Sequence, residues 1–405
     1  MSAAKNAWYR TCQVGFSAAA YLLNWRKPTV VSGVGSTSKL PEIMRSCGVS
    51  KVMVVTGPHV GKSLAPGIIA NLENNGVACV HYSGVEANPS TTTVYEIRKL
   101  YQENDCNGFL PIGGGSPMDA AKAAAALIAR PNKTLGQMAG LLKVIRRLPP
   151  VIAVPTTAGT GSETTFAAVI TDAETHHKYA IMDPRLFPLY AVLDPETTRD
   201  LPAKTTSTTG MDALTHAVEA YVCCLNRTAE SDRLAEEATV TIFEYVERAY
   251  RDGNDMEARG QMLEAAFKAG FAFTRAGVGN VHAIAHTLGG LYGTPHGLAN
   301  AVILPIVLED YGPAVYKRLS KLAGLTGTKT TGSDEEKAKA FIAEIYAMNK
   351  RMNIPAGLGN IKEEDIPQMV AWALAEANPT YPVPVIYDEA RCEKVIRRVM
   401  AMAEE

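Results

Sequence analysis

The sequence lacks the features that mark several large classes of protein. Acidic and basic residues nearly balance, with a formal net charge of -1, and no basic run suggests a nucleic acid as partner. No stretch is long and apolar enough to span a membrane. The seven cysteines are an odd number without a CxxC spacing, which favours reduced thiols over a disulfide framework. We therefore expect a cytoplasmic protein that binds neither nucleic acid nor membrane.

What the sequence does contain is enough apolar material for a large core. Hydrophobic residues make up 47% and charged residues 20% of the 405 residues, which is ordinary for a globular protein. A length of about 150 residues per domain predicts two or three domains. Residues 1–25 carry Lys5 and Arg10 ahead of an apolar run, but no cleavage pattern of a signal peptide follows. We interpret them as an N-terminal arm that forms an edge strand, a short helix or a flexible segment.

Extended β-branched runs recur through residues 26–203, and helical stretches separate the first five of them. The runs are TVVSG, KVMVVT, VACVHY, GFLPI, VIAVP, AAVIT and YAVLD. The helical stretches include residues 38–47, 66–74 and 91–103. This alternation predicts an α/β domain with a mainly parallel sheet, in which ligands bind beyond the carboxyl ends of the strands. Strand-like runs vanish from Met211 onward, so residues 204–405 are predicted to form an all-helical domain.

Two loops rich in glycine and hydroxyl groups follow predicted strands of the first domain. Gly113, Gly114 and Gly115 come after GFLPI, and Ser116 to Asp119 begin an alanine-rich helix. Free N–H groups at a helix N-terminus bind anions, so a pyrophosphate fits there. Alone this is a weak signal, because glycine turns join strands to helices in many folds. The second loop, PTTAGTGSE after VIAVP, has the same character and strengthens the interpretation.

The predicted helical domain contains a carboxylate and several histidines in a pattern typical of a metal site. Asp212 and His216 stand four residues apart, as do His282 and His286, and His296 follows. Residues four apart share one face of a helix, so each pair can point to the same place. A carboxylate with several imidazoles suits Fe(II) or Zn(II). We expect a cleft between the two domains to bring this site and the glycine loops together.

Taken together, GGGSPMDAAK, PTTAGTGSE, GMDALTHAVEAY and HAIAHTLGGLYGTPHGLANAVILP resemble the iron-containing (group III) alcohol dehydrogenase family. The resemblance covers nearly the whole chain from about Val30. It implies a Rossmann-like dinucleotide-binding domain followed by an all-helical metal-binding domain, the dehydroquinate synthase-like arrangement. It also implies a metal-dependent, NAD(P)-linked alcohol dehydrogenase or aldehyde reductase, in which a hydride moves between nicotinamide C4 and a short-chain alcohol or aldehyde on the metal. A homodimer or higher homo-oligomer is expected.

The resemblance also implies roles for individual residues. The implied metal ligands are Asp212, His216, His282 and His296, and His286 matches a histidine with a proton-relay or substrate role. The implied cofactor contacts are Gly57, Asn88, Gly113, Gly114, Gly115, Ser116, Pro117, Met118, Asp119, Thr156, Thr157, Thr160, Lys178 and Leu193. Positions that line the substrate pocket match Phe166, Ala167, Phe273 and Arg275. Asp119 also suits a plain capping role in its helix. The histidines without a match, expected at the surface or in loops, are His59, His81, His176 and His177.

Two positions depart from the family pattern and bear on specificity. Gly57 stands where NAD-preferring relatives carry an aspartate for the ribose hydroxyls, so a 2′-phosphate has room and His59 and Lys62 offer positive charge. We expect NADP(H) to be accepted, unless the glycine serves only the turn. Arg275 stands where a neutral polar residue is common. A guanidinium there could bind a carboxylate, sulfonate or phosphonate tail, or could instead pair at a domain interface.

Several alternatives stay open at this point. Within the family, the chain could be a reductase of an anionic semialdehyde, such as a 4-hydroxybutyrate-type dehydrogenase, or a glycerol dehydrogenase. A non-redox metalloenzyme would leave the nicotinamide-type loops without a purpose, and HAIAH lacks the glutamate of HExxH zinc proteases. The complete set of metal-ligand residues argues against a scaffolding protein with a vestigial site. The family favours Fe(II) as the metal, whereas the usual order of affinities favours Zn(II).

Overall fold

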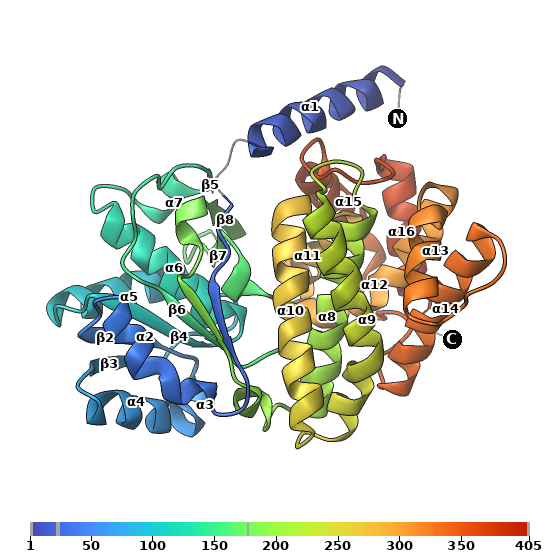
Figure 1. Ribbon diagram of the computed structural model, residues 1–405. Coiled ribbons are helices and arrows are strands. Elements are labelled where there is room, and N and C mark those ends of the chain that lie inside the picture. Colours follow the sequence, from blue (N-terminus) through green and yellow to red (C-terminus); the bar gives the residue numbers. More distant parts are fainter. Residues whose placement is uncertain (1–2, 22–24, 176–177, 403–405) are drawn as a thin grey trace. The chain divides into compact units, whose positions relative to one another are not determined.

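The computed structural model describes residues 3–21, 25–175 and 178–402, which form two compact units (Figure 1). The α/β unit spans Asn24–Leu201, and the helical unit consists of Met1–Leu23 together with Pro202–Glu405. The prediction of an α/β part and an all-helical part is confirmed. Two histidines that we expected at the surface or in loops, His176 and His177, lie outside the described residues.

A parallel six-stranded sheet forms the centre of the α/β unit. Its order is β1-β9-β6-β4-β2-β3. The strands are β1 (Thr29–Ser32), β2 (Lys51–Val55), β3 (Ala78–Tyr82), β4 (Gly108–Gly113), β6 (Ile152–Pro155) and β9 (Tyr190–Leu193). Because β3 lies on one side of β2 and β4 on the other, the direction of winding reverses between β2 and β4. Ligands of open α/β sheets bind beyond the carboxyl ends of the strands at such a switch point.

Helices cover both faces of this sheet because successive residues of its strands are apolar. Val52 and Val54 of β2 pack with α2 and α4, whereas Met53 and Val55 pack with α5 and α6. The helices of the unit are α2 (Leu40–Ser46), α3 (Pro58–Ser63), α4 (Ala65–Asn74), α5 (Thr91–Glu103), α6 (Gly115–Ala129) and α7 (Leu135–Met138). Burial on both faces explains why the inner strands β2, β4, β6 and β9 are continuous apolar runs rather than alternating ones.

A second, smaller sheet was not anticipated from the sequence. The run AAVIT forms β7 (Ala167–Thr171), which pairs antiparallel with β8 (Lys178–Met182), and β5 (Gly140–Leu141) completes the sheet. The residues of β8 are mostly half-buried or exposed, and its first residue is a lysine. Its residues 179–182 are nevertheless all apolar, so a short run of the kind that identified the other strands was present and was overlooked.

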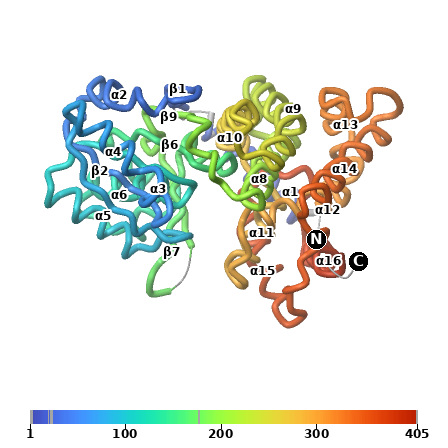
Figure 2. Tube along the Cα trace, turned by 90° about the horizontal axis from the view of Figure 1, so that it is seen from below, coloured from blue at the N-terminus to red at the C-terminus, as the bar shows by residue number. Residues whose placement is uncertain are grey.

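The helical unit has no strand among the residues that the structure describes. Helices α8, α9 and α10 pack against one another, and α12 packs on α8 (Figure 2). The helices are α8 (Ala203–Val222), α9 (Ala229–Arg251), α10 (Met256–Ala276), α11 (Asn280–Tyr292), α12 (His296–Tyr311), α13 (Tyr316–Leu325), α14 (Asp334–Arg351), α15 (Ile366–Ala377) and α16 (Glu389–Ala401). In the described part of the chain no helix is long and apolar enough to cross a membrane.

The N-terminal arm is a helix, α1 (Ala3–Tyr21), one of the forms that we expected. Arg10 donates to the carbonyl oxygens of residues 383 and 384 at 2.7 and 2.9 Å, and Gln13 donates to that of residue 381 at 2.7 Å. Gln13 is buried, whereas Trp8 and Phe16 are 63% and 50% exposed. Polar side chains therefore fasten α1 to residues 381–384, and large apolar side chains of the helix stay exposed.

Candidate functional site

Four side chains of the helical unit converge on one point. One potential ligand atom from each lies within 4.8 Å of the others, and we call the set the His–Asp cluster: Asp212, His216, His282 and His296. The first two lie one turn apart on α8, the third is in the first turn of α11, and the fourth is the first residue of α12. Three of the side chains are buried, whereas His296 is partly exposed. The cluster is therefore accessible from the side of His296.

Helices α8 and α12 approach closely at the cluster because residue 297 is glycine. A Cβ atom on Gly297 would lie 2.4 Å from the carbonyl oxygen of Thr208 and 3.4 Å from Cβ of Asp212. Any larger residue would push apart the helices that carry Asp212 and His296. Glycine at this position therefore sets the spacing within the cluster.

The cluster has the lone pairs that a cation requires. Nδ2 of Asn300 donates to Oδ1 of Asp212 at 2.7 Å and lies 3.2 and 3.0 Å from Nε2 of His282 and His296. The amide nitrogen has two hydrogens and no lone pair that accepts, so an Nε2 atom that faces it presents a lone pair and not a hydrogen, and the lone pairs of both imidazoles converge with that of the carboxylate. Burial, more than the neighbouring imidazoles, lowers the pKa of His282 well below 6.5. The neutral ring is the form that binds metal, so these residues fit a divalent ion.

Glu219, which we did not single out from the sequence, contacts one of the clustered histidines. Its Oε2 lies 2.6 Å from Nδ1 of His282, and its two oxygens accept N–H groups of Gly279 at 3.0 Å and Val281 at 2.8 Å. Burial raises the pKa of Glu219 to about 7 in spite of these donors. Glu219 stands three residues after His216 on α8, and this spacing was the signal that could have identified it.

His286 of α11 lies beside the cluster, with its ring stacked 5.2 Å from that of His296 between centroids. Its Nδ1 is 2.7 Å from Oε1 of Glu376, and Tyr381 Oη donates to the same oxygen at 2.6 Å. Burial disfavours ionisation of Glu376, but His286 and the hydrogen bonds outweigh burial and lower its pKa below 4.5. No local pattern marks Glu376, because it lies 90 residues after His286 and approaches it only in the fold.

The two glycine loops of the α/β unit contact each other. A Cβ atom on Gly114 would lie 3.2 Å from Oγ1 of Thr157, and one on Gly115 would lie 3.3 Å from Cγ2 of Thr160. The first loop leads from β4 into α6, and Gly114 has no side chain to cap the N–H groups of the first turn of α6. Such a turn at the switch point of the sheet fits the pyrophosphate of a dinucleotide.

The other predicted cofactor contacts differ in whether their side chains are exposed to a ligand or buried in the protein. Asn88 accepts a hydrogen bond from Nζ of Lys178 at 2.8 Å, and its own N–H donates to Oγ of Ser116 at 3.3 Å, so these three residues lie together. Gly57 precedes α3 beyond the carboxyl end of β2. Four predicted contacts have buried side chains, which limits their contacts with a ligand mainly to backbone atoms: Pro117, Met118, Thr156 and Leu193.

Asp119, which we predicted to contact the cofactor, joins the two loops. Its Oδ1 accepts from Oγ of Ser162 at 2.7 Å and its Oδ2 accepts from the N–H of Val169 at 3.0 Å. Lys122, one turn later and fully buried, donates to Oγ of Ser162 at 3.0 Å and to Oγ1 of Thr165 at 2.9 Å. Burial raises the pKa of Asp119 and lowers that of Lys122 to about 8. The pair fastens the second loop to the start of α6.

The four residues expected to line a substrate pocket belong to different units. Phe166 packs edge-on against Trp25, with 5.4 Å between ring centroids, and Ala167 begins β7. In the helical unit, Phe273 stacks on the ring of His216 at 4.2 Å, and Arg275 donates to the carbonyl oxygen of residue 20 in α1 at 3.2 Å. Phe273 thus supports a member of the His–Asp cluster, and Arg275 caps the last turn of α1.

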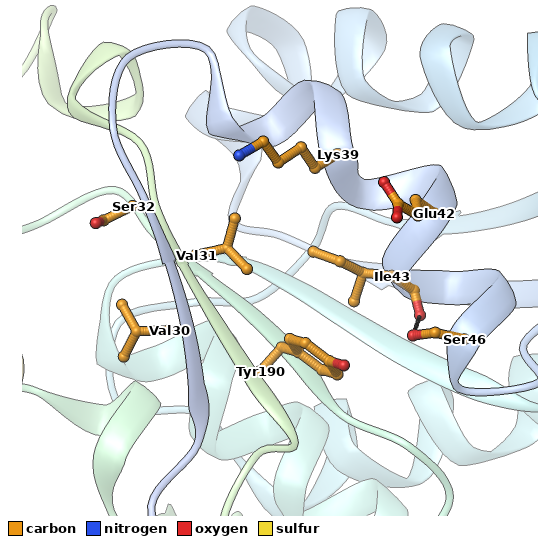
Figure 3. Close-up of a pocket in the computed structure, with 8 residues that line it drawn as sticks. All are labelled: Val30, Val31, Ser32, Lys39, Glu42, Ile43, Ser46 and Tyr190. Atoms are coloured by element: carbon orange, nitrogen blue, oxygen red, sulfur yellow. Dashed lines mark hydrogen bonds between the residues drawn. The ribbon is translucent and has the colours of Figure 1, made fainter.

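A pocket of about 440 Å³ lies at the β1 edge of the central sheet (Figure 3). Its lining consists of Val30, Val31, Ser32, Lys39, Glu42, Ile43, Ser46 and Tyr190. None of these residues belongs to the glycine loops or to the His–Asp cluster. The pocket is therefore not part of the candidate site.

Comparison with protein families matches nearly the whole chain to two related models. Residues 27–195 match the model described as iron-containing alcohol dehydrogenase. Residues 206–400 match the C-terminal model of the Fe-containing alcohol dehydrogenase family. Helix α1 lies outside both matches.

Characterised relatives and solved structures agree with these matches. The NAD-dependent methanol dehydrogenase of Bacillus methanolicus is 36% identical over 84% of this chain and 90% of its own length. The 1,3-propanediol dehydrogenase of Klebsiella pneumoniae is 36% identical over 88% and 92%. A solved 1,3-propanediol oxidoreductase superposes with a TM-score of 0.90 at 34% identity, covering 93% of this chain and 100% of that one. Sulfoacetaldehyde reductase from Bifidobacterium kashiwanohense, solved with NAD+, gives a TM-score of 0.84 at 28% identity, covering 94% and 99%.

Proposed function

The chain belongs to the iron-containing alcohol dehydrogenase family, and from this premise we propose which of its residues carry out the reaction. It is an oxidoreductase that transfers a hydride between a nicotinamide cofactor and a small alcohol or aldehyde. The family rules out the non-redox metalloenzyme and the scaffold that the sequence left open. The convergence of the His–Asp cluster is the observation that carries the proposal.

We propose that the four residues of the His–Asp cluster hold the metal and that residues 204–405 form the metal-binding domain. A divalent ion bound there supplies a Lewis acid for the substrate oxygen, and the nicotinamide supplies or accepts the hydride. His282 contributes Nε2, because its Nδ1 faces Glu219. The buried side of the cluster excludes water, and the partly exposed His296 marks the side from which a substrate enters.

His286 is the residue that we propose for proton transfer. Its Nδ1–H donates to Glu376, so Nε2 keeps a lone pair that can accept the hydroxyl proton of an alcohol. In the reverse direction the same nitrogen returns a proton to the product oxygen. The side chain is 45% exposed, which lets the imidazole exchange that proton with solvent.

Residues 26–203, of which all but the last two belong to the α/β unit, form the proposed dinucleotide-binding domain. The uncapped first turn of α6 donates N–H groups to the pyrophosphate, and Gly114 and Gly115 let it approach the backbone. Asn88 orients the ammonium group of Lys178 toward the same region through the bond to Oδ1. Asp119 acts indirectly, because it holds the second loop against α6.

We propose that NADP(H) is accepted as well as NAD(H). Gly57 has no side chain to repel a 2′-phosphate, and a Cβ atom there would lie 3.1 Å from the carbonyl oxygen of Val85. His59 and Lys62 are exposed on the adjoining helix α3. We expect Gly57→Asp to lower kcat/KM for NADPH far more than for NADH. A wild-type enzyme with a large preference for NADH would reject this part of the proposal.

The metal, the assembly and the compartment complete the proposal. Fe(II) is the proposed ion and Zn(II) its competitor, since the same ligands bind Zn(II) more tightly in the usual order. A homodimer or larger homo-oligomer is supported by the edge position of β1, in which Val30 is 41% exposed, and by Val34 just after this strand, which is 61% exposed. A cytoplasmic location is supported by the seven cysteines, all of which are described and unpaired.

A panel of short-chain alcohols and aldehydes, assayed with both cofactors on Fe(II)- and Zn(II)-reconstituted protein, tests the function. We expect activity that a chelator abolishes and that added metal restores. His282→Ala should abolish activity, and His286→Ala should reduce kcat by about 10²- to 10⁴-fold. The control His81→Gln changes an exposed histidine outside the site and should leave activity intact. Failure of every substrate to give metal-dependent activity would reject the proposal.

A second candidate is the reduction of an anionic aldehyde, which the similarity to a sulfoacetaldehyde reductase favours. Arg275 is the residue predicted to bind the anionic group, although its Nη1 already donates to α1. If Arg275 binds substrate, Arg275→Gln raises KM for an acidic aldehyde and leaves KM for a neutral one of similar size unchanged. Equal changes for both substrates would exclude this role.

A further inference from the structure

A histidine that binds a metal through one ring nitrogen needs its other nitrogen to be fixed. The second nitrogen usually donates to a carboxylate or a carbonyl, which sets the tautomer and the direction of the ring. In the His–Asp cluster this condition is met for His282 by a residue that is not itself a ligand. Glu219 Oε2 lies 2.6 Å from His282 Nδ1, and both side chains are almost completely buried, with 2% and 3% exposed.

Two independent contacts fix the tautomer of His282. On one side Glu219 takes the hydrogen of Nδ1. On the other side Nδ2 of Asn300 lies 3.2 Å from Nε2, and because this nitrogen has no lone pair that accepts, a hydrogen on Nε2 would have no acceptor there. The Nε2 atom therefore carries the lone pair, and that atom faces Asp212 and His296.

The same carboxylate also fixes the backbone that carries His282. Oε2 and Oε1 of Glu219 accept the N–H groups of Gly279 and Val281 at the start of α11, at 3.0 and 2.8 Å. Residue 279 is a glycine at the point of contact, and a Cβ atom there would lie 2.7 Å from Oε1 of Glu219. Glu219 thus sets both the position of the first turn of α11 and the direction of the imidazole on it.

We propose that Glu219 is a positioning residue for the catalytic metal, acting through the ring of His282 rather than through contact with the ion. The proposal rests on the proposed metal site. A carboxylate suits this role because three N–H groups converge on it, and only a group that accepts at every position satisfies all three. A glutamine of the same shape accepts through one atom but directs an NH₂ group at the remaining donors.

The test measures metal affinity directly. Wild-type protein and Glu219→Gln are stripped with a chelator and titrated with Zn(II) or Co(II) in competition with a chromophoric chelator. We expect Kd to weaken by about 10- to 100-fold in the variant and the absorption bands of bound Co(II) to shift. NAD(H) affinity, measured by fluorescence, should stay unchanged, because the dinucleotide loops belong to the other unit. The control Thr215→Val removes a buried hydroxyl of α8 that bonds only the backbone of Met211, and should bind metal like the wild type.

A double-mutant cycle tests whether Glu219 acts through His282. In a His282→Ala background the additional change Glu219→Gln should weaken metal binding no further. If the losses of metal affinity in the two single variants add in full in the double variant, Glu219 does not act through the ring of His282 and the inference is overturned. This comparison separates positioning of the imidazole from a general effect on packing.

A measurement on the wild type alone keeps the inference testable if the variant does not fold. The ¹⁵N shifts of labelled histidine should identify His282 as the Nδ1–H tautomer, and an Nε2–H tautomer would overturn the inference. A wild type that binds metal, paired with a folded Glu219→Gln that binds it equally well, overturns the inference and leaves the proposed function intact. A wild type that binds no divalent ion overturns both.

Discussion

At the scale of single residues, the reaction centre depends on side chains that do not contact the reacting atoms. Gly297 sets how closely α12 approaches α8, Asn300 gathers the ligand atoms, and Glu219 directs one of the imidazoles. None of these three residues needs to contact the substrate. Small changes in their volume or polarity should therefore weaken metal binding more than they slow the hydride transfer itself.

Gly297→Ala tests the close approach of α8 and α12. The added methyl group would meet the backbone of Thr208 at 2.4 Å, which side-chain rotation cannot relieve. We expect a loss of about 1 to 3 kcal/mol in the free energy of unfolding and weaker metal binding, measured by urea unfolding and chelator competition. The control Gly324→Ala, in α13 with no atom within 4 Å of the new Cβ, should stabilise by about 0.5 to 1 kcal/mol. Equal effects of the two changes would contradict the argument.

At the scale of elements, two polar connections tie distant segments together. Helix α1 is tied to residues 381–384 by Arg10 and Gln13. The second glycine loop is tied to α6 by Asp119 and Lys122. Both connections consist of hydrogen bonds and not of apolar contacts. Removing the charge or the hydrogen-bonding group should therefore weaken each of them.

Arg10→Ala should weaken the attachment of α1 to residues 381–384. The guanidinium makes two bonds to carbonyl oxygens, and hydrogen bonds of charged groups contribute about 1.5 to 3 kcal/mol each. Hydrogen exchange should become faster in α1 and near residues 381–384, while exchange in the central sheet stays unchanged. Arg10→Lys keeps the charge but loses the forked geometry and should be intermediate. Unchanged protection of α1 in Arg10→Ala would disprove this role.

The second loop contains a buried carboxyl group that should make stability depend on pH. Burial raises the pKa of Glu163 from 4.5 to about 7, and its own N–H and Lys122 offset this only partly. Between these values the folded protein holds a proton that the unfolded chain has released, so the free energy of unfolding falls as pH rises through the window. The fall amounts to about 3 kcal/mol at most.

Glu163→Gln removes that titration. The free energy of unfolding of both proteins, measured with denaturant between pH 4.5 and 7, should fall less steeply with pH in the variant. Below pH 4.5 the two slopes should become equal. Other groups titrate equally in the two proteins, so the difference isolates Glu163. Parallel pH profiles would show that the carboxyl group stays ionised in the fold.

At the scale of the whole molecule, ligand binding should stabilise the two units separately. The proposed metal ligands all belong to the helical unit, and the glycine loops belong to the α/β unit. Divalent metal at 100 times its Kd adds about 2.7 kcal/mol to the stability of the part that binds it. Hydrogen exchange should therefore slow in α8, α11 and α12 with metal, and around β4 and α6 with NAD(H). Metal that protects α6 and not α8 would contradict this assignment.

Much of the fold could be read from the sequence because its signals are local. The helix predicted over residues 91–103 is α5 with the same bounds, and the buried strands of the central sheet appear as apolar runs. Strand β8 was missed although its residues 179–182 form a short apolar run like those of the strands that were predicted. The pairing of β7 with β8 rather than with the central sheet is a tertiary outcome that no local pattern encodes.

The candidate site shows the same limit. The four-residue spacing and the family resemblance were enough to predict which ligand atoms gather. The partners of those residues were missed, because Glu376 approaches His286 only through the packing of α15 on α11. Asp119 was predicted as a cofactor contact from its place in a motif, and only the folded chain shows both of its oxygens bonded to the protein.

The attachment of α1 has a consequence for synthesis on the ribosome. Arg10 and its acceptor at residue 383 are 373 positions apart in the chain. At about 5 to 20 residues per second, roughly 20 to 75 seconds separate translation of the two. Throughout that interval the nascent helix lacks the carbonyl oxygens that Arg10 and Gln13 bond in the folded protein. The bonds of Arg10 can therefore form only late in translation, after the residues whose carbonyl oxygens accept them have been made.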